Sequence, residues 1–301
     1  MLDLYKDCIL CPRKCHTNRY QEYGYCKKSA TLKVARSALH FFEEPSISGT
    51  NGSGTIFFSG CNLKCCYCQN REISHDGFGK EITIERLSQM MLELQDKKAN
   101  NINLVTPTHF VPSIIEAIKL ARRKGLSIPI VYNTSGYESI ETLKLLDGYI
   151  DIYLTDFKYF DNELGEKLSK CSNYFEIASK ALKEMYRQTG KNKFNDNGIM
   201  IKGIIVRCLV LPTKSRDTKE IIKYLYQKYQ DNIYLSIMNQ YTPLYYIKDY
   251  PFLNETVSKN EYNEIIDYAL DLGITNAYMQ EDGTCSESFI PPFDLEGVIE
   301  K

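Results

Sequence analysis

The 301-residue sequence has no excess of charge of either sign and no long apolar run. Its 37 basic and 38 acidic residues are interspersed, which excludes the broad positive field that captures nucleic acid. The first eight residues lack the basic and apolar regions of a secretory signal, and no apolar stretch approaches transmembrane length. We therefore expect a cytoplasmic protein without nucleic-acid or membrane partners, acting on a small molecule or a protein.

Short apolar runs alternate with helical patterns after about residue 54, which indicates βα units. Composition alone allows one α/β barrel or two smaller domains. The runs are apolar on both faces, as parallel strands covered by helices must be. Such a series curls into a barrel or opens into a doubly wound sheet, and in both cases the active site lies at the carboxyl ends of the strands. The expected strands are 55–58, 102–105, 129–133, 150–156, 199–211, 233–238 and 276–280.

Helices are predicted between these strands by their apolar spacing. Leu87, Met90, Met91 and Leu94 recur at i, i+3, i+4 and i+7 behind a possible cap at Thr83. The stretch 160–197 has a helical pattern throughout and no strand. The other expected helices are 113–124, 139–147, 217–229 and 259–272, three of which end before a glycine.

A cysteine motif follows the first expected strand directly. Residues 59–70 read Ser-Gly-Cys-Asn-Leu-Lys-Cys-Cys-Tyr-Cys-Gln-Asn, a C-x3-C-x2-C spacing formed by Cys61, Cys65 and Cys68. The loop supplies no fourth ligand, so an iron-sulfur cluster held there keeps one open iron. A zinc knuckle or packed thiols are the alternatives, although zinc usually takes four ligands in C-x2-C pairs. The cysteines expected to be small buried hydrophobes are Cys66, Cys171, Cys208 and Cys285.

With Tyr67 before the last cysteine, this loop resembles the signature of the radical S-adenosylmethionine (SAM) superfamily. The resemblance implies a [4Fe-4S] cluster on Cys61, Cys65 and Cys68, whose open iron binds SAM for cleavage to a 5′-deoxyadenosyl radical. Four further segments look like uncharacterised relatives of pyruvate formate-lyase activating enzyme: 103–109, 131–137, 151–158 and 238–243. That likeness implies an α/β fold, a partial (β/α)6 radical SAM barrel over 51–301 behind a short cysteine-rich leader over 1–50.

The same resemblance implies a glycyl radical enzyme or a peptide as the substrate partner, and a flavodoxin or ferredoxin-type electron donor. Radical modification of a peptide or small molecule is the alternative among enzymes. An Fe-S electron carrier or redox sensor that never cleaves SAM is the alternative from another class. Polar residues at four successive strand ends argue against the carrier, because a carrier needs no pocket for a zwitterion.

Charged residues on two expected strands are candidates for binding SAM. Asp156 and Lys158 lie two apart and share one face of a strand, where Lys158 would neutralise the SAM carboxylate. A solvated pair at a strand end is the alternative. Arg207 stands among apolar neighbours and needs an anionic partner, which the SAM carboxylate or Asp156 would provide.

Uncharged polar residues at two other strand ends are further SAM candidates. Thr106 and Thr108 stand where the superfamily commonly has Gly-Gly-Glu, and their hydroxyls can accept an ammonium hydrogen bond. Thr108 is equally consistent with a helix N-cap. Asn133 and Ser135 could reach the ribose or carboxylate of SAM, whereas a surface turn at the following glycine explains them nearly as well.

A second cysteine group lies in the leader, where Cys8, Cys11, Cys15 and Cys26 form C-x2-C-x3-C-x10-C. Four soft ligands can close a metal site completely, which suits a structural zinc or an auxiliary [4Fe-4S] cluster. The sequence does not choose between them. A merely packed set is less expected, because a leader of this length has little core of its own.

Overall fold

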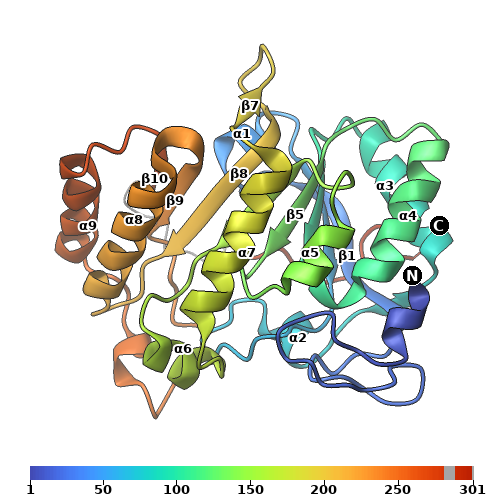
Figure 1. Cartoon of the computed structure of the whole chain (residues 1–301), viewed down its shortest axis with the longest axis horizontal. Coiled ribbons are helices and arrows are strands. Elements are labelled where there is room, and N and C mark those ends of the chain that lie inside the picture. The colour runs from blue at the N-terminus through green and yellow to red at the C-terminus, as the bar shows by residue number, and fades with distance from the viewer. Residues whose placement is uncertain (281–288, 300–301) are drawn as a thin grey trace.

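The computed structural model describes residues 1–280 and 289–299, and it is built around one curved ten-stranded sheet (Figure 1). The strand order is β10-β9-β8-β6-β5-β4-β2-β1-β3, with β7 attached to β8. From β2 to β10 the strands on this path are parallel, because a helical crossover connects each of them to the next. These strands are β2 (Ser53–Phe58), β4 (Ile102–Val105), β5 (Ile130–Thr134), β6 (Ile152–Asp156), β8 (Met200–Leu209), β9 (Tyr234–Met238) and β10 (Ala277–Met279).

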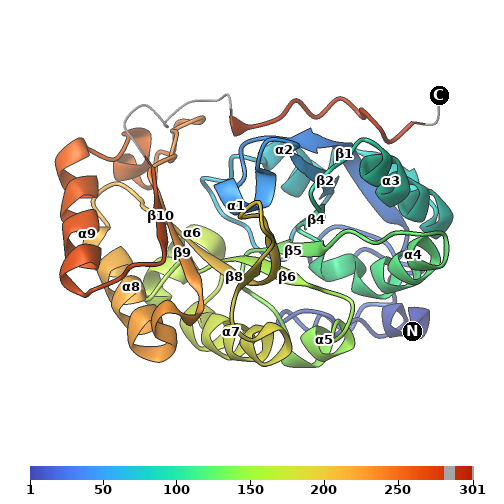
Figure 2. The same ribbon diagram turned by 90° about the horizontal axis from the view of Figure 1, so that it is seen from above.

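Helices cover the convex face of the sheet, and the sheet remains open between β10 and the β1 side (Figure 2). In the described part of the chain, six strand-helix units run from β2 to α9. This architecture confirms the partial (β/α)6 barrel. The covering helices are α3 (Ile84–Asp96), α4 (Val111–Arg123), α5 (Ile140–Leu145), α7 (Tyr174–Thr189), α8 (Ser215–Tyr229) and α9 (Lys259–Asp271).

The helix signals in the sequence are confirmed where a cap and an apolar stripe coincide. The Thr83 side chain accepts a hydrogen bond from the Arg86 amide at 3.1 Å and starts α3. The predicted stripe of α3 is buried against the sheet. The short helical turns are η1 (Leu2–Tyr5), α1 (Pro45–Ser48), α2 (Arg71–Ser74), η2 (Thr108–Phe110), η3 (Gln230–Asn232) and η4 (Pro251–Asn254).

The prediction of uninterrupted helix over 160–197 was wrong. Helix α6 (Asn162–Ser169) ends at Lys170, whose left-handed backbone (φ 56°) closes it before α7 begins. Beyond α7, strand β7 (Lys193–Phe194) pairs antiparallel with β8. Two residues are too few to show the alternation by which a strand is recognised.

Two antiparallel strands at the other edge were not predicted: β1 (Leu32–His40) and β3 (Lys80–Ile82). β1 pairs with β2 and β3, so this part of the predicted leader belongs to the sheet. Residues 1–30 contain their own apolar cluster, which packs on the barrel where the Tyr5 hydroxyl meets the Ser113 hydroxyl at 3.0 Å. The division at residue 50 stays a prediction.

Two segments border the concave side of the sheet (Figure 2). Helix α1 lies within the concavity, and residues 289–299 run along the open side beside β1. This C-terminal segment is held by backbone hydrogen bonds, from Ser37 to Glu296 at 2.8 Å and from Leu295 to Ala35 at 3.1 Å. Among the described residues, no helix has both the length and the apolar character needed to cross a membrane.

Candidate active site

The cluster loop (residues 59–70) leaves the carboxyl end of β2, where the sequence placed it. Gly60 has a φ of 89°, and a Cβ there would lie 2.8 Å from the Cys26 carbonyl oxygen. Only glycine fits such a backbone against so close a neighbour. The loop therefore turns directly against the leader.

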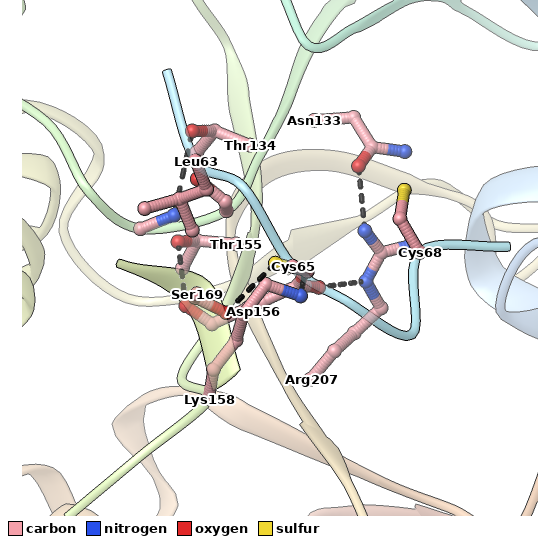
Figure 3. A network of polar contacts seen from close by, with 12 residues as sticks. Leu63, Cys65, Cys68, Asn133, Thr134, Thr155, Asp156, Lys158, Ser169 and Arg207 are labelled. Atoms are coloured by element: carbon pink, nitrogen blue, oxygen red, sulfur yellow. Dashed lines mark hydrogen bonds and ion pairs between the residues drawn. The ribbon is translucent and has the colours of Figure 1, made fainter. Parts of the chain in front are cut away.

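Each of the three predicted cluster sulfurs has one nearby polar partner. The Ser169 hydroxyl donates to Cys65 Sγ at 2.9 Å (Figure 3). Cys61 Sγ accepts the Leu63 amide at 3.4 Å, and Cys68 Sγ lies 3.2 Å from the Ser74 hydroxyl. Such contacts to cluster sulfurs orient the ligands and tune the metal centre.

Burial favours the protonated form of Cys61 and Cys65. It raises the pKa of Cys61 to about 12 and that of Cys65 to about 11, although the charge of Lys158 opposes the effect at Cys65. Within the described residues, no three Cys, His, Asp or Glu side chains are arranged to hold a single metal ion. The thiolates of a cubane bind different irons, so three sulfurs distributed along one loop fit a [4Fe-4S] cluster.

A chain of charged and amide groups lies beside Cys65 (Figure 3). Asp156 accepts from Lys158 Nζ at 2.6 Å and from Arg207 Nε at 2.9 Å, and Arg207 Nη2 donates to Asn133 Oδ1 at 2.6 Å. Burial alone would raise the pKa of Asp156, but the charges of Lys158 and Arg207 outweigh burial and lower it. The carboxyl ends of β5, β6 and β8 thus bring together four residues that the sequence singled out.

A cavity of about 210 Å³ separates the cluster loop from this polar chain. Tyr67 is buried in its wall, with its hydroxyl 2.6 Å from that of Tyr159 and its ring against Tyr241. A larger hollow of about 680 Å³ lies beside α6 and α8 but contains none of the predicted site residues, so size does not identify the site. The predicted residues that line the 210 Å³ cavity are Cys65, Tyr67, Cys68, Asn133, Asp156, Lys158 and Arg207.

Three predicted SAM residues lie outside this cavity lining. The buried Thr108 hydroxyl donates to the Glu138 carboxylate at 2.5 Å, and Phe110 rather than Thr108 is the N-cap residue of α4. The carbonyl of Ser135 accepts a hydrogen bond from Tyr174 at 2.7 Å. Thr106 continues the sheet through its backbone amide, with a positive φ of 57°.

Glu43 was missed by the sequence analysis. It follows β1, and its carboxylate accepts from Asn103 at 2.9 Å and from Arg207 at 3.3 Å. In the sequence, Glu43 stands beside a second acid, Glu44, and shortly before a proline, a pattern typical of a solvent-exposed turn. Only the position of α1 inside the concavity shows that Glu44 is buried and that the side chain of Glu43 is 9% exposed.

The leader cysteines (Cys8, Cys11, Cys15 and Cys26) lie close to the cluster loop. Cys8 and Cys26 are buried, and Cys11 and Cys15 are partly exposed. Arg13 from the leader donates to the Asn62 carbonyl in the cluster loop at 2.9 Å. Among the other cysteines, Cys171 and Cys208 are buried as predicted, Cys66 is half-buried, and Cys285 lies outside the described residues.

A half-barrel with a three-cysteine loop at the carboxyl edge of its sheet defines a class of iron-sulfur enzymes. The family model of the radical SAM superfamily matches residues 55–225, which include this loop and the strands that carry the polar chain. The chain therefore belongs to the radical SAM superfamily, which implies a [4Fe-4S] cluster and SAM as its cofactors.

Two relatives extend the match beyond that region. The chain is 33% identical over 284 residues to the uncharacterized protein MJ0674 of Methanocaldococcus jannaschii, covering 90% of this chain and 77% of the relative. It is 26% identical over 202 residues to the pyruvate formate-lyase-activating enzyme of Clostridium pasteurianum, covering 62% and 74% respectively.

Two solved structures share the fold. A radical SAM methyltransferase from Sphaerobacter thermophilus matches with a TM-score of 0.53 and 13% identity, over 76% of this chain and 66% of that one. HydG, a maturase of the [FeFe]-hydrogenase, matches with a TM-score of 0.50 and 15% identity, over 76% and 52%. At these identities the likeness concerns the fold alone, and the chain spans about half to two thirds of these structures.

Proposed function

We propose that this protein reductively cleaves SAM and that the resulting radical removes a hydrogen atom from a backbone glycine of a partner protein, as glycyl-radical-enzyme activases do. The observation that carries the first half is the polar chain of Lys158, Asp156 and Arg207 across the cavity from Cys65 and Cys68. An electron carrier needs no such group of ions in a cavity.

The charges in the cavity match the groups of SAM. SAM presents a carboxylate, an ammonium group and a sulfonium. Lys158 and Arg207 provide cations for the carboxylate, and Asn133, Asp156 and Glu43 provide oxygen acceptors for the ammonium group and the ribose hydroxyls. These side chains already hydrogen-bond one another, so SAM meets an ordered site.

The remaining residues of the cavity restrict access to it. When bound, the cluster supplies the electron that breaks a carbon-sulfur bond of SAM and yields the 5′-deoxyadenosyl radical. Tyr67 and Tyr241 wall the cavity on the side of the cluster loop, and residues 289–291 line it from the C-terminal segment. Their aromatic and apolar surfaces exclude water and oxygen from a reactive species.

Support for the activase assignment comes from the relative named as a pyruvate formate-lyase-activating enzyme. A glycyl radical enzyme as partner, a flavodoxin or ferredoxin-type donor and a cytoplasmic location complete the proposal. Radical modification of another peptide or of a small molecule remains the competing reaction, because it uses the same cofactors and the same cavity.

The test separates the two halves of the proposal. Anaerobically reconstituted protein, given dithionite and SAM, is expected to release 5′-deoxyadenosine, measured by liquid chromatography and mass spectrometry. No release at full cluster occupancy would favour the electron carrier. With pyruvate formate-lyase added, a glycyl radical in the electron paramagnetic resonance (EPR) spectrum is expected; SAM cleavage without that radical would favour the competing reaction.

A further inference from the structure

Arg19 is a fully buried arginine whose contacts include no carboxylate within the described residues. Its guanidinium donates to the backbone carbonyls of Lys28 at 3.2 Å, Ser29 at 2.5 Å and His109. The rings of Tyr5 and Phe110 lie at 4.8 and 5.5 Å. The carbonyls accept the hydrogen bonds of the guanidinium, and the rings provide cation–π contacts. Neither neutralises the full positive charge of Arg19.

The atoms beside this charge are the sulfurs of the leader. Arg19 Nη1 lies 3.9 Å from Cys8 Sγ. An arginine kept in the dry interior next to cysteines is thus compensated when those cysteines are ionised, which a soft metal brings about.

Gly24 lies against the same cysteines and the same arginine. A Cβ built on Gly24 would lie 3.5 Å from both Cys15 Sγ and Cys26 Sγ and 3.6 Å from Arg19 Cδ, so the two sulfurs face one point beside Arg19. The backbone of Gly24 does not itself require glycine, since its φ is not in the left-handed range and the contacts of a Cβ would be ordinary. The lack of a side chain matters here for the space it leaves.

We infer that the leader cysteines hold a [4Fe-4S] cluster of net negative charge, and that Arg19 is the counter-cation of this centre. The described cysteines offer no site for a single metal ion, which excludes zinc, whereas the thiolates of a cubane bind different irons. Four thiolates around such a core leave a charge of about −2, which the guanidinium stabilises. The inference stands apart from SAM cleavage, because it concerns a separate group of ligands.

The centre is also placed to support the cluster loop. Arg19 donates to the His109 carbonyl, and His109 Nε2 donates to the Ser59 carbonyl at 2.8 Å, two residues before Cys61. Burial lowers the pKa of His109 to about 3, so the ring is neutral and its Nε2 carries the proton that the carbonyl accepts. A metal that fixes the leader therefore fixes the start of the cluster loop through Arg19 and His109.

The first experiment isolates the leader centre. In a full-length variant with Cys61, Cys65 and Cys68 replaced by alanine, any tightly bound metal belongs to the leader. Elemental analysis after anaerobic purification is expected to find about four irons per chain. No iron after reconstitution with iron and sulfide, or a single zinc ion in its place, would overturn the inference.

The second experiment tests Arg19 in that background by metal release to a chelator. Arg19→Met is expected to release metal at least about tenfold faster than the parent. Arg19→Lys keeps the positive charge and should release metal at nearly the rate of the parent. Arg86→Met is the matched control, because Arg86 is also buried and bonded to carbonyls but has Glu93 as its partner at 2.7 Å. Equal release by Arg19→Met and Arg86→Met would contradict the role of Arg19.

A third variant guards against a failure to fold. Gly24→Ala fits the leader without strain but places a methyl group beside both sulfurs, so it should retain the circular dichroism of the parent and lose leader metal. In the otherwise unaltered chain, it should also reduce the EPR signal of the reduced radical SAM cluster through the weakened loop support. Full leader metal in Gly24→Ala would show that no centre occupies this space.

Discussion

Cys65 and Cys66 are adjacent and chemically alike, yet their surroundings differ. Cys65 is buried, accepts a hydrogen bond from Ser169 and lines the cavity. Cys66 is half-buried, and its amide is bonded to the Leu168 carbonyl at 2.8 Å. The spacing that named Cys65 as a cluster ligand therefore agrees with its surroundings.

We predict that Cys66→Ala keeps the cluster and SAM cleavage and loses only about 1 kcal/mol of stability, as expected for a small hydrophobe. Cys65→Ala should lose the iron of this cluster and 5′-deoxyadenosine formation, because two thiolates do not retain the cubane. Iron content and product yield in the two variants give the result. The reverse pattern would move the ligand from Cys65 to Cys66.

Glu138 is a buried acid whose carboxylate accepts the hydroxyls of Thr108, Thr134 and Tyr132. Burial raises its pKa from 4.5 to about 7, against the opposing effect of these donors. The folded state therefore binds a proton more tightly than the unfolded state. The stability contributed by that proton is present below about pH 4.5 and is lost as the pH rises through 7.

We predict that the free energy of unfolding falls by about 3 kcal/mol between pH 4.5 and pH 8 because of this one group. Glu138→Gln, which cannot ionise, should lack that part of the pH dependence. Urea unfolding of both proteins across this range measures the difference. Parallel curves for the two proteins would show that Glu138 has an ordinary pKa.

At the scale of elements, the C-terminal segment depends on one glycine. Gly297 has a φ of 68°, and a Cβ there would lie 2.1 Å from the Ser37 carbonyl oxygen of β1. The preceding Asp294 and Glu296 form ion pairs with Arg36, so the segment is also attached directly before this close contact.

We predict that Gly297→Ala detaches the segment at a cost of about 2 kcal/mol or more. Limited proteolysis should then cleave after residue 288 more readily, and SAM should bind more weakly because residues 289–291 line the cavity. Gly198→Ala is the control, since Gly198 has a similar φ of 72° with nothing within 4 Å. Equal proteolysis of both variants would show that backbone strain rather than the close contact matters.

The sequence predicted inner strands such as β4 and β5 because they are buried on both faces and are largely apolar. β1 escaped prediction because Lys33, Arg36 and Ser37 interrupt it, and its pairing with β2 comes from the sheet rather than from local pattern. The apolar pattern of a strand shows how many of its faces are buried. For an edge strand, the segments that bury those faces lie far away in the sequence, so its local pattern does not predict the strand.

For the molecule as a whole, the site residues that the sequence predicted lie at the ends of predicted strands. The parallel order of these strands in the sheet brings the residues together. Asp156, Lys158 and Arg207 were found in this way. Glu43 and residues 289–291 were not, because they reach the cavity from the connection between β1 and α1 and from the C-terminal segment. Such positions depend on packing between remote segments, and no local spacing encodes it.

The hydrogen bond from Ser169 to Cys65 joins residues 104 positions apart. Of the residues that line the cavity, 289–291 come last in the sequence. A ribosome makes the chain from its N-terminus, so the cluster loop emerges well before Ser169 and long before that segment. While the chain is still being translated, the cysteines of the cluster loop are exposed, so iron and sulfide can bind to them directly. In the folded protein, residues 289–291 line the cavity beside Cys65 and Cys68, so we expect iron and sulfide to reach these cysteines more slowly after folding than during synthesis.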